Sequence, residues 1–250
     1  MFRKPSFINI ALLGAIFLIG TIVLAPAAMA GHYNDWGKRM YRVTITNALL
    51  GQPVAPSVIA THTDAFRLFE LGPTPESGDP DYDLYFGIAT AAETGSPVPL
   101  VDEVAAADGV WEAVALLTDR SPPILLPGES NSTTISARGN AKFLSAAAML
   151  GKTNDAFYAV RSVPLPSRVG EVTRAYADAF DAGSEANEES ADTVGGADGD
   201  EPGGTTINDN GEGYIFVHAG IHGVGGEGGL DPAIYDWRNP VVEVTIERIR

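Results

Sequence analysis

Short segments in which apolar and polar residues alternate recur along this chain, and they constrain its fold more than any other feature. The clearest are Tyr41–Thr46 and Val241–Ile249. Successive side chains of a strand point to opposite faces of a sheet, so this alternation predicts strands that are buried on one face. We expect the first and last strands to be neighbours.

Further segments have the composition of strands and are bounded by Gly, Pro or Asn. They are residues 132–137, 143–149, 156–162, 174–180 and 214–219. Short strands at irregular spacing are typical of an antiparallel sandwich. We therefore predict an all-β fold, an antiparallel β-sandwich with long acidic and Gly-rich loops and little helix. Residues 100–107 could form a helix, and the pattern leaves 111–117 open between strand and helix.

One long stretch of the chain is acidic and contains no basic residue. Between Arg174 and Arg238 there is no Lys or Arg, whereas the same span carries fourteen Asp and Glu residues. Such a stretch needs hydrated cations around it or a bound cation inside it. Within it, residues 189–213 are rich in Gly, Asp and Asn and lack apolar periodicity, which predicts a long loop.

The first thirty residues are organised like a signal peptide. Arg3 and Lys4 precede an apolar run over residues 8–24, and small residues at 28 and 30 form a cleavage site before Gly31. We expect a signal peptide over 1–30 and one domain over 31–250, with its core at about 41–249. Retention of the segment as an uncleaved anchor is the alternative. The predicted location is secreted or cell-envelope, without stable membrane insertion after cleavage.

Charge and cysteine content limit the partners of the mature domain. The formal net charge is −16 and becomes −18 when Arg3 and Lys4 are removed with the signal peptide. A chain of this charge repels nucleic acid and anionic lipid, so neither is expected as a direct partner. The chain has no cysteine, so packing or a metal ion would have to hold its loops in place of disulfides.

Three acids form a candidate metal site. Asp181 and Glu185 bracket a turn with Gly183, where glycine lets the backbone fold back so that both carboxylates face one point. Asp155 begins the predicted strand 156–162 and would lie at the same end of the fold if that strand pairs with 174–180. Such a site would suit Ca2+, a hard cation with about 6–8 oxygen ligands. Spacing alone favours another interpretation, in which Asp155 forms an Asx turn and the other two are solvated loop acids, because short loops with two acids are common.

A second, weaker metal site involves His218 and His222. On a helix, two histidines four residues apart could bind one transition metal. Gly220 and the β-rich residues before it favour a strand instead, in which the two side chains lie about 13 Å apart along the chain. A metal-dependent hydrolase using His218 and His222, completed by Glu227 or Asp231, is therefore an alternative that requires a bend at Gly220.

A structural, acidic envelope protein is a further alternative.

The order of several segments resembles the spondin domain, the amino-terminal module of F-spondin and mindin, and more narrowly its bacterial secreted branch. The matching segments are 41–47, 143–157, the turn Asp181-Ala-Gly-Ser-Glu185, and 236–245, together with 213–223 and 236–240 for the bacterial branch. The resemblance extends over about residues 41–249. The Asp-Ala-Gly turn is its most specific part.

This resemblance implies an antiparallel β-sandwich with one calcium ion bound by Asp155, Asp181 and Glu185. It also implies a non-catalytic extracellular binding or adhesion module, whose partner would be an extracellular or cell-envelope protein or glycan. Animal spondin domains have Asp where this chain has Glu185, which can chelate through both oxygens and should retain calcium. They also place Trp and Cys where this chain has Phe157 and Tyr158, so their specific partners are not transferred.

Overall fold

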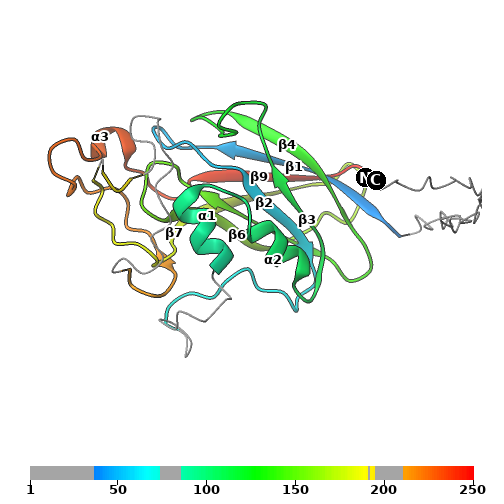
Figure 1. Ribbon diagram of the computed structural model, residues 1–250. Coiled ribbons are helices and arrows are strands. Elements are labelled where there is room, and N and C mark those ends of the chain that lie inside the picture. Colours follow the sequence, from blue (N-terminus) through cyan, green and yellow to red (C-terminus); the bar gives the residue numbers. More distant parts are fainter. Residues whose placement is uncertain (1–36, 74–85, 191, 195–210) are drawn as a thin grey trace, which may run out of the picture. The chain divides into compact units, whose positions relative to one another are not determined.

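The computed structural model describes residues 37–73, 86–190, 192–194 and 211–250. In these residues the chain is mostly β, and its strands form an antiparallel sheet in the order β3-β2-β5-β6-β7-β9-β1-β4, with β8 paired to β7 (Figure 1). The strands are β1 (Arg39–Asn47), β2 (Ser57–His62), β3 (Val110–Leu116), β4 (Ser130–Ala137), β5 (Phe143–Met149), β6 (Ala156–Pro164), β7 (Val172–Asp181), β8 (Phe216–Val217) and β9 (Val242–Arg248). The helices are α1 (Phe86–Thr94), α2 (Leu100–Ala106) and α3 (Pro232–Tyr235).

The two end strands of this order, β3 and β4, lie against each other, so the sheet is nearly closed. Side chains join them at what we call the seam, formed by Trp111 and Glu112 of β3, Ser136 of β4 and Thr61 of the neighbouring β2. The indole N–H of Trp111 donates to the Ser136 hydroxyl at 3.1 Å, and the Ser136 N–H donates to the Glu112 carboxylate at 2.7 Å. The Thr61 hydroxyl donates to the Ser136 carbonyl oxygen at 2.6 Å.

The interior of the sheet is filled by alternate residues of its strands. Tyr41, Val43 and Ile45 of β1 are fully buried, whereas Arg42 and Thr44 between them are exposed or half-buried. Full burial of a Val or Ile side chain stabilises the fold by roughly 1.5–3 kcal/mol. The same interior contains Ile59, Ile135, Leu144, Tyr158, Val244 and Ile246. The alternation predicted for residues 41–46 is therefore confirmed.

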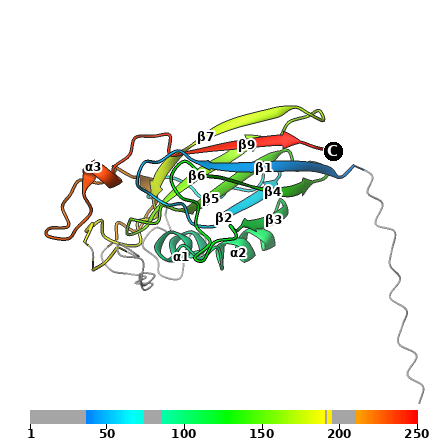
Figure 2. The same ribbon diagram turned by 90° about the horizontal axis from the view of Figure 1, so that it is seen from above.

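Helices α1 and α2 cover the outer face of the half of the sheet that contains β2, β5 and β6 (Figure 2). Phe157 of β6 and Phe180 of β7 pack there against Phe69, with ring centroids 5.4 and 5.1 Å from that ring. Leu100 and Val104 of α2 complete this second apolar layer. Strands beneath the helices are therefore buried on both faces, which is why every residue of β2 is buried.

Most of the predicted strands are confirmed. Residues 41–46, 132–137, 143–149, 156–162, 174–180 and 241–249 fall in or nearly coincide with β1, β4, β5, β6, β7 and β9. The first and last strands, β1 and β9, pair with each other as expected. Residues 100–107, for which a helix was one option, contain α2, and the undecided segment 111–117 largely coincides with strand β3. The all-β prediction with little helix is therefore correct.

Other predictions differ from the structure or lie outside it. Residues 214–219 contain only the two-residue strand β8, and the sequence reasoning did not predict β2 or α1. The predicted signal peptide lies outside the described residues, as does most of the loop predicted at 189–213. Within the ranges that the structure describes, none of the helices has the length and apolar character needed to cross a bilayer.

Candidate metal centre

Asp155 and Asp181 lie next to each other at the ends of two paired strands. Asp155 immediately precedes β6, Asp181 is the last residue of β7, and Ala156 is the register partner of Asp181. The N–H of Ala182 extends this pairing by donating to the Asp155 carbonyl oxygen at 3.2 Å. Both aspartates are fully buried. The sequence analysis expected Asp155 and Asp181 to lie at the same end of the fold if these two strands pair, and β6 and β7 do pair.

The turn after β7 wraps around the carboxylate of Asp155. The N–H groups of Ser184 and Glu185 donate to its Oδ2 at 2.8 and 3.0 Å, and the Ser184 hydroxyl lies 3.2 Å from the same atom. Asp181 holds its own turn, because its Oδ1 accepts the Gly183 N–H at 2.8 Å. The other oxygen of Asp155, Oδ1, is buried and has no hydrogen-bond partner among the described residues.

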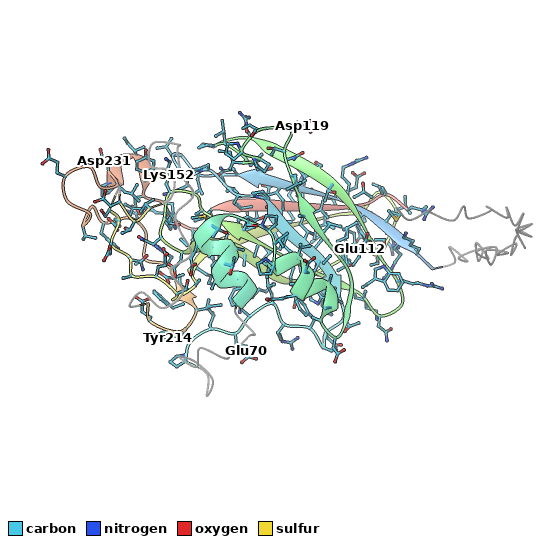
Figure 3. The ribbon with its side chains drawn as sticks, viewed as in Figure 1. Glu70, Glu112, Asp119, Lys152, Tyr214 and Asp231 are labelled. Atoms are coloured by element: carbon cyan, nitrogen blue, oxygen red, sulfur yellow. The ribbon has the colours of Figure 1, made fainter. Side chains whose placement is uncertain are left out.

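Gly183 is required by the contact between this turn and residues 211–214. It has a φ of +70°, and a Cβ built on it would lie 2.2 Å from the Tyr214 carbonyl oxygen. The Gly213 N–H also donates to the Gly183 carbonyl oxygen at 2.8 Å. Figure 3 shows Tyr214 and Lys152 at this end of the sheet and Glu112 toward the other. The contact brings Glu212 close enough for its charge to raise the pKa of Asp181.

The structure adds Glu93 as a fourth acid, which the sequence reasoning missed. Glu93 lies near the end of α1, is 3% exposed, and neither of its carboxylate oxygens has a hydrogen-bond partner in the described part of the chain. Glu185 is also buried, at 8% exposed, and its charge acts on Glu93 together with that of Asp155. A signal was present in the sequence, because Glu93 is the only charged residue in the segment that forms α1.

These buried carboxylates raise one another's pKa values. Burial raises the pKa of Glu93 to about 7, and the charges of Glu185 and Asp155 add to the rise although the nearby Ser184 hydroxyl opposes it. Burial, and then the charge of Asp155, raises the pKa of Asp181 to about 8. Burial raises the pKa of Asp155 as well. A buried carboxylate is stable only with a proton, hydrogen-bond donors or a cation.

His218 lies beside this cluster, and its ring is already engaged. Its Nδ1 accepts the Gly220 N–H at 3.0 Å, so the proton of the neutral ring is on Nε2, which lies 3.1 Å from the Asn187 side-chain oxygen. Asn187 in turn donates to Asp181 Oδ2 at 2.6 Å. Burial lowers the pKa of His218 to about 4, so His218 is neutral at pH 7 and does not neutralise Asp181, whose Oδ2 is 3.8 Å from Nε2.

The two histidines of the weaker predicted site differ in their surroundings. His218 is buried with both ring nitrogens in hydrogen bonds, whereas His222 is exposed and donates its backbone N–H to Glu189 at 2.7 Å. A transition metal on His218 would have to displace one of its two hydrogen bonds. The oxygen-rich cluster around Asp155 is therefore the stronger candidate for a metal.

The four acids offer a cation unsatisfied oxygens, but their side chains are not arranged around one point. The unpartnered, buried oxygens of Glu93 and Asp155 are sites that a cation would satisfy. As they stand, however, no three or more His, Asp or Glu side chains among the described residues are arranged to hold an ion. The backbone holds the two aspartates in place, so an ion would have to draw in the longer, more rotatable side chains of Glu93 and Glu185.

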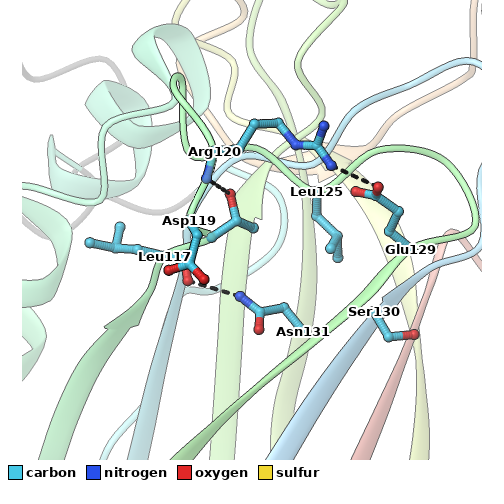
Figure 4. A pocket seen from close by; sticks show the side chains of 8 residues that line it. Leu117, Asp119, Arg120, Leu125, Glu129, Ser130 and Asn131 are labelled. Atoms are coloured by element: carbon cyan, nitrogen blue, oxygen red, sulfur yellow. Dashed lines mark hydrogen bonds and ion pairs between the residues drawn. The ribbon is translucent and has the colours of Figure 1, made fainter.

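A separate hollow of about 560 Å3 lies where β3 ends and β4 begins (Figure 4). Arg120 and Glu129 form an ion pair across it at 2.7 Å, and the Asn131 amide donates to the Leu117 carbonyl oxygen at 2.8 Å. Its lining, residues 117–120, 125 and 129–131, includes none of the four buried acids. The hollow is therefore distinct from the candidate metal centre.

Comparison with known proteins assigns no family to the chain. Neither a protein-family model nor a curated protein sequence matches it. The spondin resemblance therefore rests on the sequence segments described above.

Proposed function

We propose that this chain is an exported, non-catalytic, calcium-binding module of the spondin type that acts in extracellular binding or adhesion. The observation that carries the proposal is the group of buried carboxylates where β6 begins and β7 ends, in which both oxygens of Glu93 and Oδ1 of Asp155 have no hydrogen-bond partner among the described residues. An unpaired buried charge costs several kcal/mol, so these acids are stable either when protonated or when a cation compensates their charge, and a bound cation would let them remain ionised.

The donors favour calcium over a transition metal. Asp155, Asp181, Glu185 and Glu93 supply oxygen only, and the Ser184 hydroxyl is a further oxygen in the same turn. Calcium prefers about 6–8 oxygen ligands in a flexible arrangement, whereas zinc prefers nitrogen and sulfur in a tetrahedral one. The chain has no cysteine, and His218 is engaged elsewhere.

The proposed ion has a structural role. Glu93 belongs to α1, Asp155 and Asp181 belong to the paired ends of β6 and β7, and Glu185 belongs to the following turn. An ion bound by all four would tie the helical layer to the sheet.

We also propose that the nearly closed sheet has the architecture of a sandwich, in which β1, β4 and β9 face β2, β5 and β6. The buried residues of these six strands belong to one core, which supports this description.

The proposal includes export through the signal peptide at 1–30, with a partner that is an extracellular or cell-envelope protein or glycan. The high negative charge of the mature chain supports the exclusion of nucleic acid as a direct partner. No specific observation favours a hydrolase over this binding module, because His218 has both ring nitrogens in hydrogen bonds.

Calorimetric titration of calcium into the protein purified after export tests the proposal. We expect one saturable site and a rise in melting temperature that follows its occupancy, because an ion that binds only the folded state stabilises it. Asp181→Ala should abolish both, whereas Glu188→Gln, at an exposed neighbouring position, should preserve both. Equal stabilisation by sodium and calcium at the same ionic strength would contradict a specific site and favour a salt-adapted envelope protein.

A further inference from the structure

Glu189 is a buried acid that lies outside the candidate metal centre, and both of its carboxylate oxygens accept hydrogen bonds from the backbone. It is 4% exposed, and its carboxylate accepts three consecutive backbone N–H groups, those of His222 at 2.7 Å, Gly223 at 2.5 Å and Val224 at 2.9 Å. Three successive amides pointing at one anion form a backbone nest. The side chain of Glu189 therefore clamps the glycine-rich loop, residues 221–230, onto the segment after the candidate metal centre.

The backbone of Glu189 completes the clamp. Its carbonyl oxygen accepts the Leu230 N–H at 3.0 Å, so Glu189 holds the loop near both of its ends. A Cβ on Gly225 would lie 2.0 Å from that carbonyl oxygen, so only glycine fits there. Glu189 itself has a φ of +53°, a conformation that is unfavourable for a residue with a side chain. These contacts keep Glu189 in that conformation.

The clamp is connected to two of the proposed calcium ligands. The Glu189 N–H donates to the side-chain oxygen of Asn154 at 3.2 Å, and Asn154 directly precedes Asp155. A second connection joins Asp181 to the residues just before the glycine-rich loop. The Asn187 amide donates to Asp181 at 2.6 Å, and the Asn187 side-chain oxygen lies 3.1 Å from Nε2 of His218. Asp155 is thus linked through Asn154 to the segment that carries Glu189, and Asp181 is linked through Asn187 and His218 to Gly220, directly before the loop.

We propose that the clamp couples the metal centre to the glycine-rich loop, so that calcium binding orders residues 221–230 and loss of calcium releases them. This inference rests on the proposed calcium function. Val224, at the clamped position, is 65% exposed, so the coupling controls how the loop presents its surface. Coupling between two sites is reciprocal, so a loop that calcium orders must, when clamped, strengthen calcium binding by the same factor.

Hydrogen exchange with and without calcium tests the coupling on the protein purified after export. In the wild type, calcium should slow exchange of the amides at 222–224 by about tenfold or more, a typical size for coupled sites. Glu189→Gln should lose this response and raise the calcium Kd by a similar factor. Glu188→Gln, one residue away and exposed, should behave as the wild type.

Calorimetry on the same samples separates the two proposals. Calcium binding by the wild type with unchanged exchange at 222–224, or a wild-type Kd in Glu189→Gln, would overturn the coupling and leave the calcium function intact. No binding by the wild type would overturn both. If Glu189→Gln does not fold, Asn154→Ala removes one connection with Glu189 in place; it should weaken the exchange response, and a full response in it would overturn the proposal.

Discussion

At the scale of single residues, the main feature of this protein is that several acids are buried close together. Asp155 Oδ2 is well satisfied, because it accepts from Ser184 and Glu185, but its Oδ1 and both oxygens of Glu93 have no partner in the described residues. Leaving a buried acceptor unsatisfied costs about 1–3 kcal/mol, and more when the group is charged. Glu93 is thus the residue whose replacement best separates stability from metal binding.

Glu93→Gln is expected to have opposite effects on these two properties. Without calcium at a pH of about 8, where Glu93 is largely ionised because its pKa is about 7, removal of the buried charge should raise the melting temperature by a few degrees, at about 2–4 °C per kcal/mol. The calcium Kd should increase about tenfold or more through loss of a carboxylate ligand. Thermal unfolding with a chelator and calorimetry with calcium measure the two effects.

The exposed Glu70 provides the matched control for this substitution. Glu70→Gln removes the same charge from the chain and should change neither property by more than a small amount. A fall in the melting temperature of Glu93→Gln without calcium would show that the Glu93 carboxylate is stabilised in the folded state.

At the scale of elements, side chains close the sheet where no backbone ladder does. Ser136 of β4 accepts from Trp111 and donates through both its N–H and its hydroxyl to Glu112, and its carbonyl oxygen accepts from Thr61. The polar side chains of the seam thus satisfy an edge strand that would otherwise present unpaired backbone groups. They make the contact between β3 and β4 dependent on a few residues.

Ser136→Ala should weaken the seam. The substitution removes the hydroxyl that joins Trp111 and Glu112 and leaves their polar atoms short of partners, at an expected cost of about 1–3 kcal/mol in the free energy of unfolding. Ser132→Ala on the same strand is the control, since Ser132 is exposed and its hydroxyl is hydrogen-bonded, on the exposed side of the sheet, to Thr44 at 2.8 Å; it should cost less than about 0.5 kcal/mol. Equal effects in chemical denaturation would contradict a special role for the seam.

At the scale of the whole molecule, the buried acids make stability depend on pH. The pKa of Asp181 rises from 3.8 to about 8 on folding and that of Glu93 from 4.5 to about 7. Because both values are higher in the folded state, the folded protein binds more protons between the unfolded and folded values. The contribution of these groups is complete below a pH of about 4 and is lost as the pH rises through about 7–8.

Without calcium, the melting temperature should therefore fall as the pH rises from about 6 to about 8.5. Calcium should reduce this fall, because a bound cation stabilises the ionised carboxylates. Thermal unfolding across this range, with a chelator and with saturating calcium, measures both effects. A melting temperature that rises with pH in the chelator would mean that the acids are not held in a protonated, buried state.

Much of this architecture could be predicted from the sequence, and the exceptions have a common cause. Residues 41–46 and 241–249 alternate because one face of each strand is solvated. Strand β2 does not alternate, because helices cover its second face and all its residues are buried. Helix α1 was missed for a related reason, since Ala, Thr and Gly supply little amphipathic contrast. Burial by distant segments removes the patterns on which prediction depends.

By itself, the sequence determined most of the strands, that a glycine turn follows β7, and that Asp155 and Asp181 stand at strand ends, because these features depend on neighbouring residues. Only the tertiary structure decided that α1 carries Glu93 to the same place and that Glu189 clamps the glycine-rich loop. Both contacts join segments that are far apart in the chain, and the packing of helices and loops on the sheet brings them together.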